Sequence, residues 1–179
     1  LLDLVNNVLD MNKLESGQVR LEQKPFDLLE LFRETVSLVE VQAVECQVDF
    51  QVDVCKGVHW NVLGSPLHLR QILVNIIGNA VKYTPPGTDI TLSARREGDT
   101  VRVEIADTGP GIPQEAQGRL FQMFYTAGND RGDGRRGLGL GLALCKSIVE
   151  AHGGEIGMRA NEPHGSVFFF TLQAEEIKL

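Results

Sequence analysis

The sequence has few of the residues that would indicate a disulfide-stabilised, nucleic-acid-binding or membrane-spanning protein. Its three cysteines (Cys46, Cys55 and Cys145) show no CxxC spacing, so neither a disulfide framework nor a zinc site is predicted. Positive charge is scarce, because 24 acidic residues against 17 basic ones give a net charge of −7. That balance disfavours nucleic acid and acidic membranes as partners. No apolar run approaches membrane-spanning length, and we expect a cytosolic protein with reduced thiols.

The chain begins with LLDLVNN, without an initiator methionine and partway through a helical pattern. Apolar residues recur at helical spacing over residues 1–16, and a lone amphipathic helix needs a partner to bury its apolar face. With Pro25 as a plausible boundary, we expect a fragment with a helical segment over 1–24 and one domain over 25–179. Any membrane attachment would then come only from segments upstream.

Hydrophobic periodicity predicts the remaining elements. Helices are expected over residues 27–43, 66–83, 119–124 and 138–151, and strands over 46–54, 58–64, 89–97, 100–107, 154–160 and 165–173. We expect strand 58–64 to pair with strand 46–54. Strands 89–97 and 100–107 should form an antiparallel hairpin. This mixture predicts an α+β fold, a two-layer α/β sandwich.

The helix expected over residues 66–83 carries a polar stripe. Asn75 and Asn79 lie four residues apart and share one face with Lys82, opposite an apolar side. Asparagine is a mediocre helix former, and a buried amide without a partner costs about 1–3 kcal/mol. The stripe therefore needs either other protein groups or a bound polar ligand.

A glycine-rich segment leads into the last predicted helix. Gly137, Gly139 and Gly141 would bring backbone N–H groups close to an anion at a helix N-terminus. A tight loop-to-helix junction packed on the sheet is an equal alternative. No Gly-Lys-Ser/Thr follows, so the segment is not a P-loop, and the GxGxxG beginning at Gly132 follows no strand, which argues against a dinucleotide fingerprint.

The segment DTGPGIP directly follows an expected strand. It places Asp107 in a glycine turn, where a carboxylate could accept a hydrogen bond from an exocyclic amine such as that of adenine. A solvated turn is the simpler alternative. The triplet also resembles that of aspartic proteases, but those need two carboxylates and only one copy is present.

Together these segments predict a nucleotide site. Asn79 would offer its amide oxygen to Mg²⁺, Lys82 would neutralise phosphate charge, and Tyr83 would stack on or line the base. The polar linker over residues 125–136 is typical of a mobile lid. Its arginines could reach a γ-phosphate or could face solvent: Arg131, Arg135 and Arg136.

The ordered segments NIIGNAVKYT, DTGPGIP, LFQMFY, GLGLGLAL and HGG resemble the N, G1, F, G2 and G3 boxes of sensor histidine kinases. From about Phe26 onward the chain is similar to their catalytic and ATP-binding domain, in the superfamily shared with gyrase, Hsp90 and MutL-type ATPases. VLDMNKLESGQV resembles the second helix of the preceding dimerisation and phosphoacceptor domain. The resemblance implies the Bergerat ATP-binding fold, a mixed sheet packed on three helices, preceded here by one amphipathic helix.

The resemblance also assigns roles to residues. It implies Mg²⁺ at Asn79, phosphate contacts at Asn75 and Lys82, and the adenine amine at Asp107. Because an amide cannot act as a general base, Asn75 implies a site that withholds hydrolysis until a protein nucleophile arrives. The expected ATP-binding residues are Asn75, Asn79, Lys82, Tyr83, Asp107, Gly109, Gly111, Ile112, Tyr125, Arg135, Arg136, Gly137, Leu138, Gly139, Leu140 and Gly141, with Asn75 and Lys82 catalytic and Asn79 the metal ligand.

Some positions depart from the family's pattern. Gly78 replaces a common acidic residue, Leu138 a frequent Thr or Ser, and Thr126 a frequent Arg. Losing that Arg would shift phosphate contacts to Arg135 or Arg136. No histidine of this chain is followed by the phosphoacceptor pattern (His59, His68, His152 and His164), so the acceptor is expected upstream.

The implied function is that of an ATP-dependent protein-histidine kinase using ATP and Mg²⁺. It would transfer the γ-phosphoryl group to a histidine on its own dimerisation domain, within a homodimer whose further partner is a response regulator receiver domain. The domain would lie in the cytoplasm, with the full-length protein attached to the inner membrane. Two alternatives remain: a nucleotide-binding sensory or scaffold module without phosphotransfer, and a hydrolytic ATPase of the same superfamily.

Overall fold

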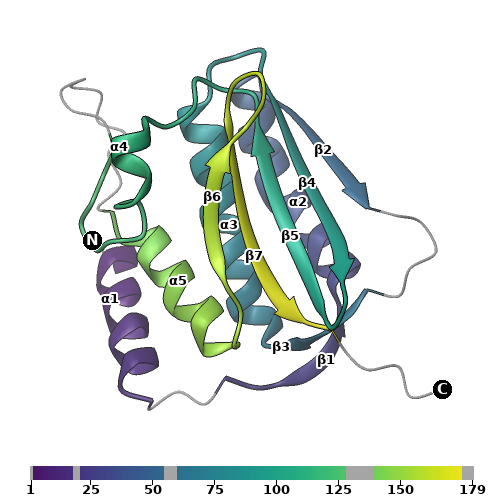
Figure 1. Ribbon diagram of the computed structural model, residues 1–179, viewed down its shortest axis with the longest axis vertical. Coiled ribbons are helices and arrows are strands. Elements are labelled where there is room, and N and C mark those ends of the chain that lie inside the picture. Colours follow the sequence, from purple (N-terminus) through teal and green to yellow (C-terminus); the bar gives the residue numbers. More distant parts are fainter. Residues whose placement is uncertain (1, 18–20, 55–59, 128–138, 175–179) are drawn as a thin grey trace.

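The computed structural model describes residues 2–17, 21–54, 60–127 and 139–174. A β-sheet forms one layer and helices cover one of its faces (Figure 1). The helices are α1 (Leu2–Glu15), α2 (Leu28–Glu45), α3 (Pro66–Tyr83), α4 (Gln114–Gln117) and α5 (Gly141–Ala151), and the strands are β1 (Lys24–Asp27), β2 (Asp49–Val54), β3 (Asn61–Gly64), β4 (Asp89–Glu97), β5 (Thr100–Asp107), β6 (Ile156–Ala160) and β7 (Ser166–Gln173). The predicted two-layer α/β sandwich is confirmed.

The main sheet has five strands in the order β2-β4-β5-β7-β6. β2 and β4 are parallel because the chain between them passes through α3, whereas every other pair is antiparallel. The predicted hairpin between β4 and β5 is confirmed, and Gly98 turns it with a φ of 62°. Buried and half-buried residues alternate along β5, with Val101, Val103 and Ile105 on the helix side. The same period of two places Asp107, at the end of the strand, on that side.

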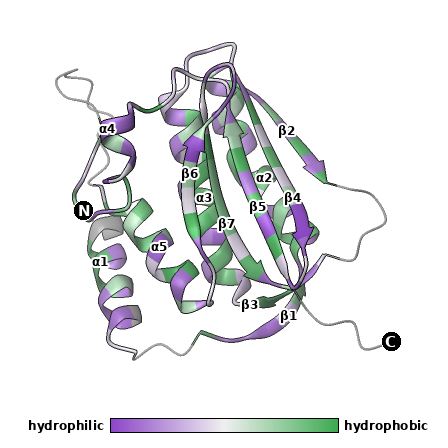
Figure 2. Ribbon diagram, viewed as in Figure 1, coloured by the Kyte–Doolittle hydropathy of each residue, from purple (hydrophilic) through white to green (hydrophobic). Residues whose placement is uncertain are grey.

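Three helices form the second layer. α3 packs against both α2 and α5, and α1 packs on the outer side of α5 (Figure 1). Bands of hydrophobic and hydrophilic residues alternate along the strands and helices in Figure 2, as two-faced elements require. The predicted apolar side of α3 is buried at Leu69, Leu73, Ile76 and Ile77, and each such side chain contributes about 1.5–3 kcal/mol. Within the described ranges, no helix combines the length and the apolar character needed to cross a membrane.

The prediction that strand 58–64 pairs with strand 46–54 is wrong. β3 instead pairs antiparallel with β1, Val62 facing Phe26, in a separate two-stranded sheet. The sequence did not predict β1, because four residues are too few to show an alternating pattern. Its last residue, Asp27, is also the N-cap of α2 and accepts a hydrogen bond from the Leu29 N–H at 2.8 Å.

Two helix boundaries also differ from the prediction. The short helix expected over residues 119–124 lies earlier, at α4, and turns follow it up to Phe124. The Gln117 side chain donates to the Ile112 carbonyl at 3.0 Å and holds this earlier turn, and Gly118 ends the helix. α5 begins at Gly141, because Gly139 has a φ of 70° that no right-handed helix allows.

His152, which follows α5, connects the two central helices. Its Nε2 accepts a hydrogen bond from the Ser65 N–H at 3.0 Å, and its Nδ1 donates to the Ile148 carbonyl at 2.7 Å. A backbone N–H can only donate and a carbonyl can only accept, so the buried imidazole is neutral with its proton on Nδ1. Burial accordingly lowers the pKa of His152. Protonation would place an N–H donor on Nε2 opposite the Ser65 N–H donor and break this hydrogen bond.

This geometry predicts a loss of stability in mild acid. Because the folded-state pKa of His152 lies below its usual 6.5, the unfolded chain binds this proton first as the pH falls. The contribution of His152 to the free energy of unfolding should be constant above about pH 7 and should decrease as the pH falls through 6.5. Urea unfolding at pH 7.5 and pH 5.5 measures the difference, which His152→Gln should reduce.

Burial also lowers the pKa of His68, so part of the slope should persist in that variant. Equal pH slopes for the parent and His152→Gln would contradict the proposed role of His152.

Candidate functional site

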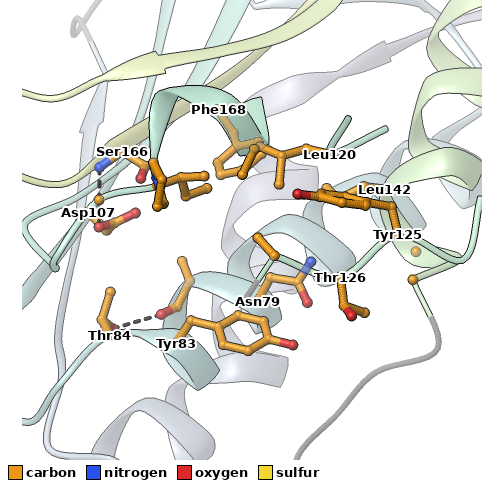
Figure 3. Close-up of a pocket in the computed structure, with 18 of the residues that line it drawn as sticks. Asn79, Tyr83, Thr84, Asp107, Leu120, Tyr125, Thr126, Leu142, Ser166 and Phe168 are labelled. Carbon is orange, nitrogen blue, oxygen red and sulfur yellow. Dashed lines mark hydrogen bonds between the residues drawn. The ribbon is translucent and has the colours of Figure 1, made fainter. Parts of the chain in front are cut away.

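A cavity of about 870 Å³ opens beside α3 and the start of α5 (Figure 3). It lies within the size range of small-molecule sites. The side chains and backbone around it come from five parts of the chain: α1 (Asn7), α3 and the residue after it (Asn79, Ala80, Tyr83 and Thr84), the segment from β5 to α4 and beyond (Asp107, Pro110, Gly111, Ile112, Pro113, Ala116 and Leu120), the two sides of the undescribed linker (Tyr125, Thr126, Ala127, Gly139, Leu140, Gly141 and Leu142) and β7 (Ser166 and Phe168).

Asp107 lies at one side of the cavity and is only 7% exposed. Its Oδ1 accepts hydrogen bonds from the N–H groups of Gly109 at 2.9 Å and Ser166 at 3.3 Å. Within the described residues its Oδ2 accepts none. Burial raises the pKa of Asp107, and the two N–H donors only partly oppose that rise. One carboxylate oxygen is thus fixed by the backbone and the other is available to a ligand.

The turn between β6 and β7 braces the loop that follows Asp107. The Asn161 amide donates to the Asp107 carbonyl at 2.9 Å, and His164 Nδ1 donates to the Gly109 carbonyl at 3.3 Å. Gly111, with a φ of 78°, approaches Gly165 so closely that an added Cβ would lie 3.2 Å from its carbonyl oxygen. The DTGPG loop is therefore positioned by the neighbouring hairpin as well as by its own glycines.

Of the polar stripe predicted on α3, only one residue lines the cavity. Asn79 reaches the cavity, and its amide makes no hydrogen bond within the described part of the chain (Figure 3). Asn75 instead faces α5, with its Nδ2 3.5 Å from the Gly141 carbonyl and 3.7 Å from Cys145 Sγ. Burial raises the pKa of that thiol to about 12, so it is protonated. Lys82 lies outside the lining with its ammonium group 5.1 Å from the Tyr83 ring centroid.

Two segments that flank the undescribed linker are joined at the opposite side of the cavity from Asp107. The Phe124 N–H donates to the Gly139 carbonyl at 3.0 Å. A Cβ on Gly139 would lie 2.6 Å from the Tyr125 carbonyl oxygen, so only glycine permits this approach. Tyr125 lines the cavity, and the Arg119 guanidinium carbon lies 4.5 Å from the centroid of its ring, in a cation–π contact. Tyr125 and Gly139 are thus held in contact on either side of the residues that the structure does not describe.

The structure brings nine of the predicted residues to the cavity: Asn79, Tyr83, Asp107, Gly111, Ile112, Tyr125, Gly139, Leu140 and Gly141. Asn75, Lys82 and Gly109 lie beside it without lining it. Arg131, Arg135, Arg136, Gly137 and Leu138 lie outside the described residues, as does His59. His68 is hydrogen-bonded to Ser65 Oγ at 2.8 Å and does not line the cavity.

Sequence reasoning missed several lining residues. Ser166 and Phe168 reach the cavity through the pairing of β7 with β5, which sets Ser166 opposite Asp107. Leu120 and Leu142 resemble ordinary core residues in the sequence. Asn7 lies more than 60 residues from any predicted site residue, so only the packing of α1 on α5 brings it there. No local pattern could have identified these positions.

The contact between Gly139 and Tyr125 predicts unequal tolerance of two neighbouring glycines. Gly139→Ala should destabilise the chain by at least about 1–2 kcal/mol, because an L-residue at this φ is strained and its Cβ would clash with backbone. Gly141→Ala is the matched control, since its Cβ would meet only Asn75 at 3.7 Å or more and alanine favours a helix. Urea unfolding of both variants measures this, and equal losses of stability would contradict the described contact.

Comparison with known proteins identifies the family. Residues 64–176, more than half of the chain, match the family described as histidine kinase-, DNA gyrase B-, and HSP90-like ATPase. The sensory/regulatory protein RpfC of Xanthomonas campestris pv. campestris is 39% identical over 179 residues, which cover 96% of this chain and 24% of RpfC. The chain therefore spans about a quarter of the length of that curated relative.

Two solved structures share the fold. Full-length ShkA in complex with AMPPNP matches with a TM-score of 0.84 and 32% identity, over 99% of this chain and 37% of ShkA. Histidine kinase ThkA in complex with the response regulator protein TrrA matches with a TM-score of 0.74 and 27% identity, over 99% of this chain and 50% of that one. The chain belongs to the histidine kinase-, DNA gyrase B- and HSP90-like ATPase family, as an ATP-binding domain of the sensor histidine kinase type.

Proposed function

We propose that the cavity holds Mg-ATP with its adenine at Asp107 and its phosphates toward the start of α5, for transfer of the γ-phosphoryl group to a histidine. The observation that carries this proposal is the state of Asp107, a buried carboxylate at the cavity with one oxygen bonded to backbone and the other free of described partners. A fixed acceptor of this kind suits the exocyclic amine of adenine. Phe168, Ile112 and Leu120 offer apolar walls to a flat base.

The polar groups on the other side suit phosphate and metal. Gly141 begins an eleven-residue helix whose N-terminus borders the cavity, and such an N-terminus attracts anions. The Asn79 amide makes no hydrogen bond with the described residues, and its oxygen could coordinate Mg²⁺ while the ion keeps most of its water. In this proposal Lys82, Arg135 and Arg136 supply further positive charge to the phosphates. Further expected contacts on this side are with backbone or apolar groups of Gly137, Leu138, Gly139 and Leu140.

Asn75 supports transfer over hydrolysis. A residue that activates water for hydrolysis must accept a proton, and an amide side chain cannot do so. The Asn75 Nδ2 faces the Gly141 carbonyl. Catalysis would then consist of positioning and charge stabilisation, with the nucleophile supplied by a protein histidine. The described part of this chain offers none at the cavity, since its three histidines lie elsewhere.

The relatives suggest the remaining parts of the protein. In this proposal residues 1–24 end a dimerisation and phosphoacceptor domain, residues 25–179 form the catalytic domain, and the full-length protein is a homodimer. The complex of ThkA with a response regulator supports a receiver domain as the next acceptor of the phosphoryl group, and the complex of ShkA with AMPPNP supports ATP as the donor. Because its substrate is ATP, we place the domain in the cytoplasm.

The adenine assignment predicts a variant that folds well and binds poorly. Asp107→Asn should keep both N–H bonds to Oδ1 and should be at least as stable as the parent at pH 7, because the raised pKa of Asp107 means that its charge opposes folding there. It should nevertheless bind Mg-ATP at least tenfold more weakly, since its amide NH₂ would face the adenine amine.

Isothermal titration and urea unfolding of the same samples measure both properties. Asp99→Asn, an exposed residue in the turn at the far end of β5, is the matched control. Unchanged ATP affinity in a folded Asp107→Asn variant would contradict the adenine assignment.

The magnesium assignment predicts a loss of phosphotransfer. In the full-length protein, Asn79→Ala should slow the Mg²⁺-dependent formation of acid-labile, base-stable phosphohistidine at least tenfold, because the metal loses its protein ligand. The exposed Asn61→Ala is the control. Phosphotransfer at the parent's rate in Asn79→Ala would exclude this residue as a ligand, and steady ATP hydrolysis without phosphohistidine would favour a hydrolytic ATPase.

A further inference from the structure

Helix α1 contributes Asn7 to the lining of the cavity. Asn7 lines it together with Gly141 and Leu142 at the start of α5, the helix on which α1 packs. Asn7 is half-buried, whereas Asn6 beside it is exposed. The N-terminal helix is therefore part of the cavity wall, although the catalytic fold proposed above begins only after it.

Packing fixes α1 in this place. Met11, one helical turn after Asn7, is 8% exposed and belongs to the main hydrophobic core. Val5 and Leu9 on the other side of the helix are 48% and 47% exposed, so α1 presents a single face to α5. The charge of Asp10 also acts on His68 in α3. Asn7 is held on the side of α1 that the rest of the chain covers.

The Asn7 amide has no partner in the described part of the chain. Its side chain is half-buried and makes no hydrogen bond with the described residues, so the amide is available to a ligand or to water in the cavity. An amide offers two N–H donors and a carbonyl acceptor. Because α1 packs on α5 and Asn7 lines the same cavity as the first residue of α5, these donors could meet the oxygens of an anion bound at that helix N-terminus.

We propose that Asn7 is a nucleotide contact supplied by α1, so that nucleotide binding and docking of α1 on α5 strengthen each other. The inference rests on the proposed function, because it takes the phosphates to lie at the start of α5. If docked α1 raises the affinity for nucleotide by some factor, nucleotide must stabilise the docked helix by the same factor. Undocking of α1 would remove Asn7 from the cavity and leave the phosphates with one donor fewer.

Paired substitutions on one helix test the contact. Asn7→Asp places a carboxylate at the phosphates and should weaken binding of Mg-ATP at least tenfold, while adenosine, which has no phosphates, should bind within twofold of the parent. Asn6→Asp makes the same change at the exposed neighbour and should alter Mg-ATP binding less than twofold. Asn7→Ala should weaken Mg-ATP binding about threefold to tenfold, the loss of one hydrogen bond.

Isothermal titration of the 179-residue chain gives all of these values. Equal effects of Asn7→Asp and Asn6→Asp on Mg-ATP would overturn the inference while leaving the proposed function intact. Failure of the parent to bind either Mg-ATP or adenosine would overturn both.

Hydrogen exchange of the unsubstituted chain provides a second test that no folding defect can obscure. Saturating Mg-ATP should slow exchange of the α1 amides, because nucleotide stabilises the docked helix. Protection of the start of α5 without any change in α1 would overturn the inference.

Discussion

The position of Asp107 is the constraint on which the cavity depends. Its side chain continues the buried face of β5 beyond the last apolar residue, so the alternation that builds the core also delivers a carboxylate to the cavity. The Gly109 and Ser166 N–H groups then fix one of its oxygens, and Asn161 holds its backbone carbonyl. Sheet pairing and the proposed recognition of adenine thus use the same residue, and burial raises the pKa of its carboxyl group.

The polar groups near the cavity fall into two sets. One set is bonded within the protein: Asp107 Oδ1, Asn161 and Asn75 each have a described partner. The other set includes Asp107 Oδ2, Asn79 and Asn7, which have none among the described residues and all border the cavity. The first set fixes geometry and the second offers hydrogen-bonding capacity to a ligand. Their arrangement suits a molecule with an amine on one side and anionic groups on the other.

The sequence predicted the parts of the fold that depend on local periodicity. Asn79, Tyr83 and Asp107 were expected at one site because helical spacing and a strand end can be read directly, and they do meet there. Asn75 shares the predicted stripe but faces α5. Four residues rotate a helix by more than one full turn, so Asn75 and Asn79 point in different directions, and Asn75 meets the start of α5. The features that local periodicity does not predict depend on long-range packing.

The pairing of β1 with β3 and the approach of Asn7 and Ser166 to the cavity depend on contacts between segments far apart in the chain. No spacing within a segment encodes them. The short strand β1 shows too little alternation to be recognised alone, and Asn7 differs from Asn6 only in which side of α1 meets α5.

The most direct test of this account is a crystal structure of the chain with Mg²⁺ and a non-hydrolysable ATP analogue. The account predicts the adenine amine within hydrogen-bond distance of Asp107, the metal at the Asn79 amide oxygen and the phosphates beside the start of α5. A nucleotide bound in the reverse orientation, or bound outside this cavity, would contradict it.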